Sequence, residues 1–286
     1  MTEWGFYGRK QELAQIQAIL DRGRFFFCAI SGRRRIGKTS LIQEALRRTG
    51  SARKAIYVQI PDSDERGVVQ AFEDSFSDTP GVEVLSPHTN NFQNISTCLL
   101  TLWDSGITTA IDEFQYLNRK PLRPFLSELQ KDIDRARLRC GDAGYLDDDT
   151  RDLWKQVDDT GHVPTSGLFT LGSIHTELTA VLEDKASPLF NRVTDTLHIG
   201  HWDSATLFEM FREHGIADRH HQLFLWSIFE GIPKFYRDCF DQTILKPDAE
   251  YRRVTLRKMF FEGSSPLKDE ADNWFLRELR GRYDRL

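Results

Sequence analysis

The chain has 286 residues, of which 40% are hydrophobic and 28% are charged, so a globular protein with a packed core is expected. This length accommodates one large α/β domain with a small companion, or two modest domains. The formal net charge of −5 excludes a globally basic surface for nucleic acid, and the four scattered cysteines, without a CxxC pair, exclude a metal site built from cysteines.

Strands and helices are predicted to alternate through the first 200 residues. Apolar residues at helical spacing indicate an amphipathic helix over 9–22, and a buried strand is expected over Phe25–Ile30. The further elements expected here are a helix over Lys38–Arg48, strands over Ala55–Ile60 and Ile107–Ile111, a helix over Pro121–Arg137, and strands over Leu168–Gly172 and Thr196–Ile199. Helices are also expected within residues 61–95, but the sequence there does not define where they begin and end. The alternation indicates a parallel sheet covered on both faces, in which ligands bind at the carboxyl ends of the strands.

Beyond residue 200 the pattern changes to helices alone. Helices are expected over Ser204–His214, Asp218–Glu230 and Phe235–Leu245, and together they predict a small lid. The aromatic residues of this region are expected to form the lid core rather than a platform for stacking bases; they are Phe224, Trp226, Phe229, Phe235 and Tyr236. No apolar run approaches the roughly 18 residues of a membrane span, so a soluble, cytoplasmic protein is expected.

Residues 32–39 match the pattern G-x-x-x-x-G-K-[ST] of a phosphate loop. Glycines let the backbone curl so that N–H groups point at phosphate oxygens, and the N-terminus of the following helix adds partial positive charge. Lys38 is predicted to reach the β- and γ-phosphates of a nucleotide, and the Thr39 hydroxyl to ligate Mg²⁺. The candidate nucleotide-binding residues here are Gly32, Arg33, Arg34, Arg35, Ile36, Gly37, Lys38, Thr39 and Ser40. The three arginines are expected to be solvated, with contact to a partner as the alternative.

A strand ending in Asp112-Glu113 follows the phosphate loop along the chain. Asp112 is predicted to hold the Mg²⁺ shell, as a second acidic element does in phosphate-loop enzymes. Glu113 is predicted to orient and deprotonate the attacking water. Kinases of the phosphate-loop type usually lack an acidic base beside the metal-binding Asp, so Glu113 favours hydrolysis over transfer to an acceptor.

An ordered set of motifs extends this pattern over about residues 4–283. It runs Phe6-Tyr7-Gly8-Arg9 with Glu12-Leu13, GRRRIGKTSL, AIDEFQYL, LGS, SPLFNR and GIPKFY. The set resembles the archaeal-type ATPase family, which also occurs in bacteria and belongs to the signal-transduction ATPases with numerous domains, within the AAA+ group. The resemblance implies an α/β P-loop NTPase fold, with a five-stranded parallel sheet of order 5-1-4-3-2 flanked by helices. It also implies three parts: an ATPase core over 1–200, a helical lid over 201–262, and the start of a winged-helix region over 263–286.

The same resemblance implies roles for residues outside the phosphate loop. Tyr7-Gly8-Arg9 matches the family's start motif near the adenine, and Pro233 lies in the motif of the lid that packs on the nucleotide. The alternative for Pro233 is a helix-breaking turn. Ser173 matches the first sensor, close to the γ-phosphate. Arg192 matches an arginine that serves as a finger or a sensor, and its alternative is a structural salt bridge.

Two departures from the family stand out. The acidic segment 138–166 is longer than the family pattern and predicts a surface insertion, with one short helix around Trp154. The second departure is at the C-terminal end. Family members commonly continue into a winged-helix segment and a nuclease-like domain, whereas residues 264–286 of this sequence look like only the start of that region.

The function expected from these residues is an ATP-binding and ATP-hydrolysing molecular switch that uses Mg²⁺. The alternatives are a P-loop phosphotransferase, an ATP-controlled module associated with DNA, and a nucleotide-binding scaffold that barely hydrolyses. The net charge of −5 does not support the DNA-associated alternative. The partners that this interpretation allows are ATP and ADP, an effector domain or partner protein, and a second copy of the chain.

Overall fold

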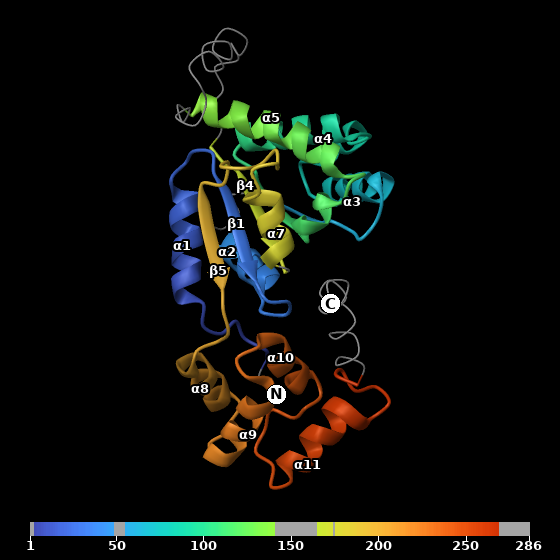
Figure 1. Cartoon of the computed structure of the whole chain (residues 1–286). Coiled ribbons are helices and arrows are strands. Elements are labelled where there is room, and N and C mark those ends of the chain that lie inside the picture. Colours follow the sequence, from blue (N-terminus) through green and yellow to red (C-terminus); the bar gives the residue numbers. More distant parts are fainter. Residues whose placement is uncertain (1–2, 49–54, 141–164, 174, 269–286) are drawn as a thin grey trace. The chain divides into compact units, whose positions relative to one another are not determined.

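A computed structural model describes residues 3–48, 55–140, 165–173 and 175–268 (Figure 1). The chain divides into two compact units, Lys10–Gly200 and the combination of Met1–Arg9 with His201–Leu286. The first unit contains all the strands of the described residues, and the second is helical. The N-terminal segment was expected in the ATPase core, whereas its described residues 3–9 belong to the helical unit.

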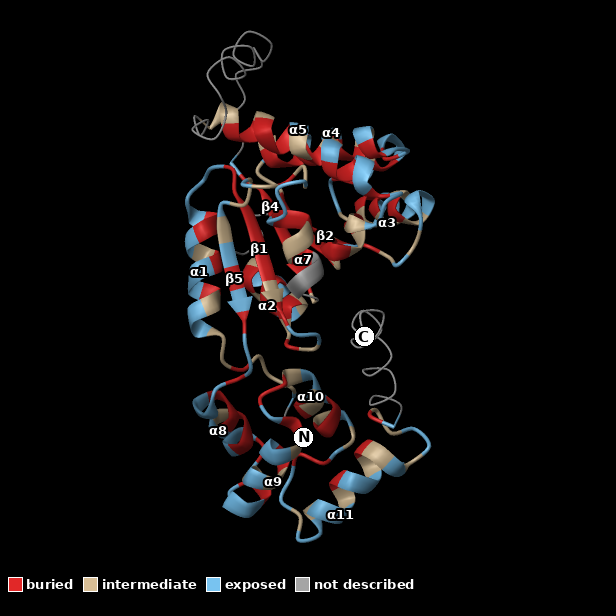
Figure 2. Cartoon of the chain, viewed as in Figure 1, coloured by how far each residue is buried: buried red, intermediate tan, exposed pale blue. Residues whose placement is uncertain are grey.

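The sheet unit is built on five parallel strands. They are β1 (Phe27–Gly32), β2 (Ala55–Gln59), β3 (Thr108–Asp112), β4 (Leu168–Gly172) and β5 (Asp195–Ile199). Their order is β2-β3-β4-β1-β5, which confirms the expected order 5-1-4-3-2 counted from the other edge. Gly32 pairs with Ile199 and Ser31 with Gly172, so the carboxyl ends of neighbouring strands lie at one edge. Strand β1, an inner strand between β4 and β5, is buried along nearly its whole length (Figure 2).

Helices flank this sheet as expected. The bounds are α1 (Lys10–Asp21), α2 (Lys38–Arg48), α3 (Glu65–Ser77), α4 (Phe92–Asp104), α5 (Arg123–Arg139) and α7 (His175–Leu182), with the 3₁₀ helices η1 (Glu83–His88) and η2 (Phe114–Asn118). Within residues 61–95, where helices were expected without definite bounds, α3 begins after Asp64 and α4 begins after Asn91. Each of these two side chains accepts a hydrogen bond from a backbone N–H of the first helical turn. The helix α7 was not predicted.

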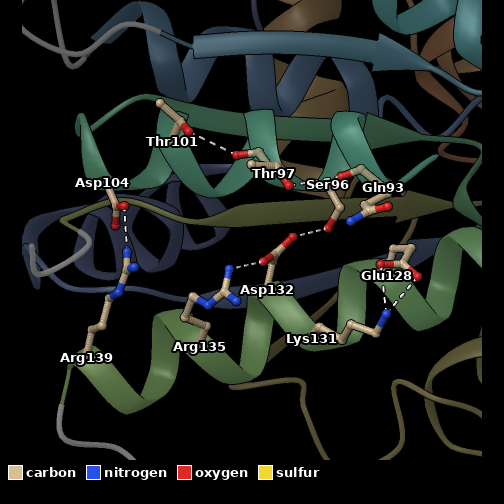
Figure 3. A network of polar contacts seen from close by, with 10 residues as sticks. All are labelled: Gln93, Ser96, Thr97, Thr101, Asp104, Glu128, Lys131, Asp132, Arg135 and Arg139. Carbon is tan, nitrogen blue, oxygen red and sulfur yellow. Dashed lines mark hydrogen bonds and ion pairs between the residues drawn. The ribbon is translucent and has the colours of Figure 1, made fainter. Parts of the chain in front are cut away.

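A polar network joins helices α4 and α5, which pack side by side (Figure 3). The Ser96 hydroxyl donates to Oδ2 of Asp132 over 2.6 Å, and Arg135 pairs with the other carboxylate oxygen of Asp132 at 3.0 Å. Burial raises the pKa of Asp132, and the hydrogen bond from Ser96 opposes that shift. The network fixes one helix against the other in the sheet unit.

The helical unit has an aromatic core. Its helices are α8 (Ser204–Glu213), α9 (Arg219–Phe229), α10 (Pro233–Asp241) and α11 (Tyr251–Leu256), followed by the π-helical turn η3 (Arg257–Phe261). Tyr7 and Trp202 meet edge-to-face with ring centroids 5.9 Å apart, and Trp202 stacks on Tyr236 at 6.0 Å. The N-terminal segment is therefore held by the helices of the second half of the chain.

The aromatic residues expected in the lid core behave differently from one another. Phe229 and Tyr236 are buried, and Phe224 and Phe235 pack partly buried against the same core. Trp226 is 52% exposed, so its prediction as a core residue is wrong. On α9, Leu225 and Phe229 already face inward, and the neighbouring position 226 points about 100° away from Leu225.

Two expectations fall largely outside the described residues. These are the acidic insertion with its helix around Trp154, of which 141–164 are not described, and the start of a winged-helix region, of which 269–286 are not described. Within the described ranges, none of the helices combines the length and apolar character needed to cross a lipid bilayer.

Candidate functional site

The predicted phosphate loop connects β1 to α2 at the carboxyl edge of the sheet. A Cβ at Gly32 would lie 2.5 Å from the carbonyl oxygen of Ile199 on β5, so a larger residue does not fit there. Gly37 has φ +87°, in the left-handed region that glycine adopts without strain. Ile36 is fully buried and anchors the loop. Of the three arginines expected to be solvated, Arg33 and Arg34 are exposed, whereas Arg35 is partly buried with φ +68°.

Lys38 is the first residue of α2 and is only 7% exposed. Its Nζ donates hydrogen bonds to the carbonyl oxygens of Gly32 at 2.8 Å and Arg33 at 3.2 Å. Burial lowers the pKa of Lys38, and the charges of Asp112 and Glu113 oppose that shift. The ammonium group therefore lies within the phosphate loop, in the field of both predicted carboxylates.

Asp112 ends β3 and accepts three hydrogen bonds. Thr39 Oγ1 donates to Oδ2 over 2.6 Å, and the Tyr57 hydroxyl donates to the same oxygen over 2.5 Å. The backbone N–H of Glu113 donates to Oδ1 over 2.7 Å. Thr39 and Asp112, predicted as the two metal ligands from separate motifs, are thus in direct contact, and Tyr57 on β2 joins them.

Glu113 follows Asp112 in the left-handed conformation, with φ +53°. Its Oε2 accepts a hydrogen bond from Ser173 Oγ, at the end of β4, over 3.1 Å. The same oxygen accepts from Nε2 of Gln115, which also donates to Ser173 Oγ over 3.3 Å. Because β4 lies between β1 and β3, Ser173 is beside the acidic pair and on the same edge as the phosphate loop.

Arg192 lies away from this edge. Its guanidinium forms a two-bond ion pair with Asp134 of α5, over 2.8 and 2.9 Å, and its Nη1 donates to the carbonyl of Phe190. Arg192 precedes β5, and Thr194 bonds to Phe27 at the start of β1, so this pair belongs to the amino edge of the sheet. The strands separate the two edges by about 16 Å. The contact with Asp134 is the structural salt bridge that was the alternative for Arg192, and the role of a finger or sensor stays a prediction.

The chemistry of the site fits a magnesium ion. Mg²⁺ prefers hard oxygen ligands, usually one or two from the protein together with substrate phosphates and water. Thr39 Oγ1 and Asp112 Oδ2 are two such oxygens, 2.6 Å apart beside the phosphate loop. Over the described ranges, no cluster of three or more His, Cys, Asp and Glu side chains could hold a metal by itself.

Residues 6–136 match the model of a protein family described as an ATPase domain predominantly from Archaea. The matched segment contains the phosphate loop, Asp112 and Glu113, and it ends within α5. Residues 6–136 are an ATPase domain of this family. The resemblance to archaeal-type ATPases is thereby confirmed for this segment. No curated protein matches the chain.

Solved structures share the fold around this ATPase domain. The Walker-type ATPase of Pyrococcus abyssi is 17% identical, with a TM-score of 0.66, over 98% of this chain and 77% of that one. The ORC2 protein of Aeropyrum pernix, in its ADPNP–ADP complexes, is 15% identical, with a TM-score of 0.55, over 86% of this chain and 67% of that one. At these identities the likeness shows the P-loop ATPase fold and nothing finer.

Four of the candidate residues lie in the helical unit. Tyr7 is buried in its aromatic core, and its hydroxyl lies 3.2 Å from Nε2 of His214. Burial, with a hydrogen bond to Glu213, raises the pKa of Tyr7 to about 12. Gly8 has φ +63°, and a Cβ there would lie 2.5 Å from Thr206 Oγ1; Arg9 also has positive φ. Pro233 is the first residue of α10, where proline favours a helix start.

Two residues of the ATPase domain's site were missed from sequence. Tyr57 lies within the apolar run AIYVQI, where a tyrosine is an ordinary strand residue. Gln115 is only 2% exposed, and its Oε1 has no hydrogen-bond partner. The position of Gln115, two residues after Glu113 in a motif quoted for the family, is the one signal that pointed to it.

Proposed function

We propose that this protein binds ATP with Mg²⁺ on the phosphate loop, hydrolyses it, and works as a nucleotide-dependent switch of the AAA+ signal-transduction type. The observation that carries the proposal is the set of direct contacts from Thr39 to Asp112 and from Glu113 to Ser173. These residues come from α2, β3 and β4, which meet only in the folded protein. Their types are those that binding and hydrolysis of a nucleoside triphosphate require.

The phosphate loop and Lys38 supply the binding step. The backbone N–H groups at the start of α2 carry partial positive charge, which favours phosphate oxygens. Lys38 now donates to two carbonyl oxygens of its own loop. Phosphate oxygens are stronger acceptors because they are charged, so Lys38 exchanges these bonds for bonds to the β- and γ-phosphates.

Thr39 and Asp112 are the residues that would hold Mg²⁺. The bound ion would offset negative charge on the phosphates. The N–H of Glu113 fixes the Asp112 carboxylate through Oδ1, and Tyr57 does so through Oδ2. A carboxylate held from both oxygens needs little reorganisation when the nucleotide arrives.

Glu113 is the general base in this proposal. It takes a proton from the water that attacks the γ-phosphorus, while the bond from that phosphorus to the bridging oxygen breaks, giving ADP and phosphate. Ser173 and Gln115 both donate to Oε2 of Glu113, so they set the direction of the carboxylate. Ser173 thereby connects the base on β3 to the end of β4.

The helical unit supplies the regulatory part of the proposal. Residues 201–262 act as the lid, Tyr7-Gly8-Arg9 and Pro233 contact the nucleotide, and 263–286 begin a winged-helix region. Hydrolysis in the ATPase domain would change the state of the lid and pass the signal to an effector domain or partner protein. The support for these assignments is the motif order in the sequence.

The decisive experiment compares wild type with Lys38→Ala and Glu113→Gln. Binding of a fluorescent ATP analogue and release of phosphate are measured, each with and without Mg²⁺. Lys38→Ala is expected to lose binding. Glu113→Gln is expected to bind like wild type while turnover falls by at least about a hundredfold, because only the base is lost.

Matched controls are available on the exposed face of α5, where Lys131 and Glu128 form an ion pair. Lys131→Ala and Glu128→Gln repeat the same chemical changes away from the site, and both should behave like wild type. Absence of ATP binding by wild type would refute the phosphate-loop assignment. Binding without turnover would refute hydrolysis and leave a nucleotide-binding scaffold.

A further inference from the structure

The helical unit carries an apolar groove between α8 and α9. On α8 the lining residues are Ser204, Leu207, Phe208 and Phe211, spaced i, i+3, i+4 and i+7. This spacing places all four on one face of the helix. Phe208 is 58% exposed, whereas Leu207 and Phe211 are buried.

Helix α9 presents a matching row of residues to the same groove. Arg219, Gln222, Leu223 and Trp226 repeat the spacing i, i+3, i+4 and i+7. Leu223 is 61% exposed and Trp226 is 52% exposed. The unit's own core takes other positions of α9, namely Leu225 and Phe229. The helix is thus apolar on two faces, of which one packs inward and one lines the groove.

The groove concentrates exposed apolar surface. Among the described residues, six large hydrophobic side chains are exposed, and three of them, Phe208, Leu223 and Trp226, line this groove. Its volume is about 790 Å³. Contiguous apolar surface of this kind costs solvation free energy, and in folded proteins it marks an interaction site.

One charge lines the groove, and it is positive. Arg219 is the first residue of α9, where the helix dipole disfavours a cation. Within the described part of the chain it forms no ion pair or hydrogen bond. A cation held at an unfavourable helix end, beside apolar side chains, complements a ligand that is apolar along its length and acidic at one end.

We propose that this groove binds an amphipathic α-helix of a partner protein, with large apolar residues along one face and a carboxylate opposite Arg219. The two rows, each spaced i, i+3, i+4 and i+7, line the groove from both sides. The spaces between their side chains can accept the side chains of a third helix. Helix α8 has 10 residues, so the bound helix covers roughly 10 residues, or ~15 Å.

Other occupants fit the groove less well. A small apolar molecule would leave the outer side chains of Phe208, Leu223 and Trp226 in water, whereas a helix covers them. Nucleic acid needs several cations along its backbone, and only Arg219 lines the groove. A second copy of the same face would bring two uncompensated Arg219 charges into one interface.

The test is a selection of helical peptides on the whole 286-residue chain. A displayed library fixes large apolar residues at i, i+3, i+4 and i+7 and varies the flanking positions. The selected peptides are expected to carry Asp or Glu at one flank. Selection on Arg219→Glu should enrich Lys or Arg at that flank instead.

Affinities of one selected peptide then locate the site. Leu223→Asp should weaken binding by at least about tenfold, because it places a charge in the apolar contact. Phe261→Asp is the matched control: Phe261 is 75% exposed in the same unit but does not line the groove, so affinity should not change. Circular dichroism shows whether each variant is folded, and both positions are exposed enough to accept the change.

Four outcomes would overturn the proposal. The first is the same acidic preference on wild type and Arg219→Glu, and the second is equal peptide affinity of wild type and Leu223→Asp. The third is a wild-type dimer in light scattering that Leu223→Asp dissociates, since a second copy would then occupy the groove. The fourth is peptide binding only after removal of residues 269–286, which would make the chain's own C-terminal segment the occupant.

Discussion

The Tyr57 hydroxyl and the Thr39 hydroxyl both donate to one oxygen, Oδ2 of Asp112, over 2.5 and 2.6 Å. Burial and the hydrogen bond to Asp112 raise the pKa of Tyr57, so the phenol keeps its proton and remains a donor. Strand β3, which ends in Asp112, has β2 on one side and β4 on the other, with β1 beyond β4. Tyr57 on β2 therefore contacts the carboxylate from the side away from β1, the strand that leads into the phosphate loop. In the proposed site, Tyr57 would orient Asp112 for the metal ion.

The first prediction concerns that orientation. Tyr57→Phe removes one hydroxyl and should raise the Mg²⁺ concentration needed for half-maximal turnover by about tenfold, because residues that hydrogen-bond to a metal-binding side chain have effects of that order. ATP binding measured without Mg²⁺ should stay unchanged. Tyr116→Phe is the control, since Tyr116 is also half-buried near Glu113 but makes no hydrogen bond to Asp112. Equal Mg²⁺ dependence of Tyr57→Phe and wild type would contradict the assigned role.

The second prediction separates catalysis from stability at Gln115. Its Nε2 bonds to Glu113 and Ser173, while its buried Oε1 has no partner. Gln115→Leu keeps most of the volume and removes an unsatisfied acceptor, so the midpoint of thermal unfolding should not fall. Turnover should drop by about tenfold because Glu113 loses a fixed donor. Lower thermal stability with normal turnover would show that Gln115 is a packing residue only.

The third prediction concerns the ion pair of Arg192 with Asp134, whose side chains are 15% and 9% exposed. Arg192→Ala leaves a nearly buried carboxylate without this partner and should destabilise the protein by about 3 kcal/mol in denaturant titrations. ATP affinity should persist below the unfolding transition. Arg47→Ala breaks an ion pair to Glu44 in which Arg47 is 72% exposed, so its denaturation midpoint should stay close to that of wild type. Loss of turnover at unchanged stability would instead make Arg192 a catalytic residue acting on another subunit.

The fourth prediction is a loss of stability in mild acid. His221 is 2% exposed and stacks on Tyr251, and burial lowers its pKa from 6.5, partly opposed by Asp218 and Asp248. Above pH 6.5 the histidine is neutral in both states. Below it the unfolded chain binds a proton that the folded chain does not, so stability falls until the pH passes the lowered folded-state pKa.

Chemical denaturation at pH 7.5 and pH 5.5 measures this dependence. His221→Gln should reduce the difference between the two pH values, and His220→Gln, at the exposed neighbouring position, should not. His214, whose pKa burial also lowers, contributes in the same direction and keeps part of the dependence in both variants. An unchanged difference in His221→Gln would show that other groups dominate.

Much of the sheet and its ligand edge could be predicted because the signals are local. The strands are short apolar runs, and Gly37, Lys38 and Thr39 come from one fixed pattern that requires a strand before it and a helix after it. Asp112 could be placed because it ends a strand. Tyr57 could not, because its role comes from the order of strands, which brings β2 beside β3. Arg192 precedes a strand, and in a parallel sheet that position lies at the edge away from the ligand.

The fifth prediction tests the close approach of the phosphate loop to β5. A Cβ at Gly32 would lie 2.5 Å from the carbonyl oxygen of Ile199, and backbone on a paired strand cannot yield as a flexible side chain can. Gly32→Ala should therefore lower the unfolding temperature and abolish ATP binding, because the loop must move away from the strand. Gly200→Ala is the matched control, since a Cβ there meets nothing within 4 Å. Normal ATP binding by Gly32→Ala would mean that the loop can shift from β5 and still hold phosphate, and the required geometry would then lie in residues 33–39 alone.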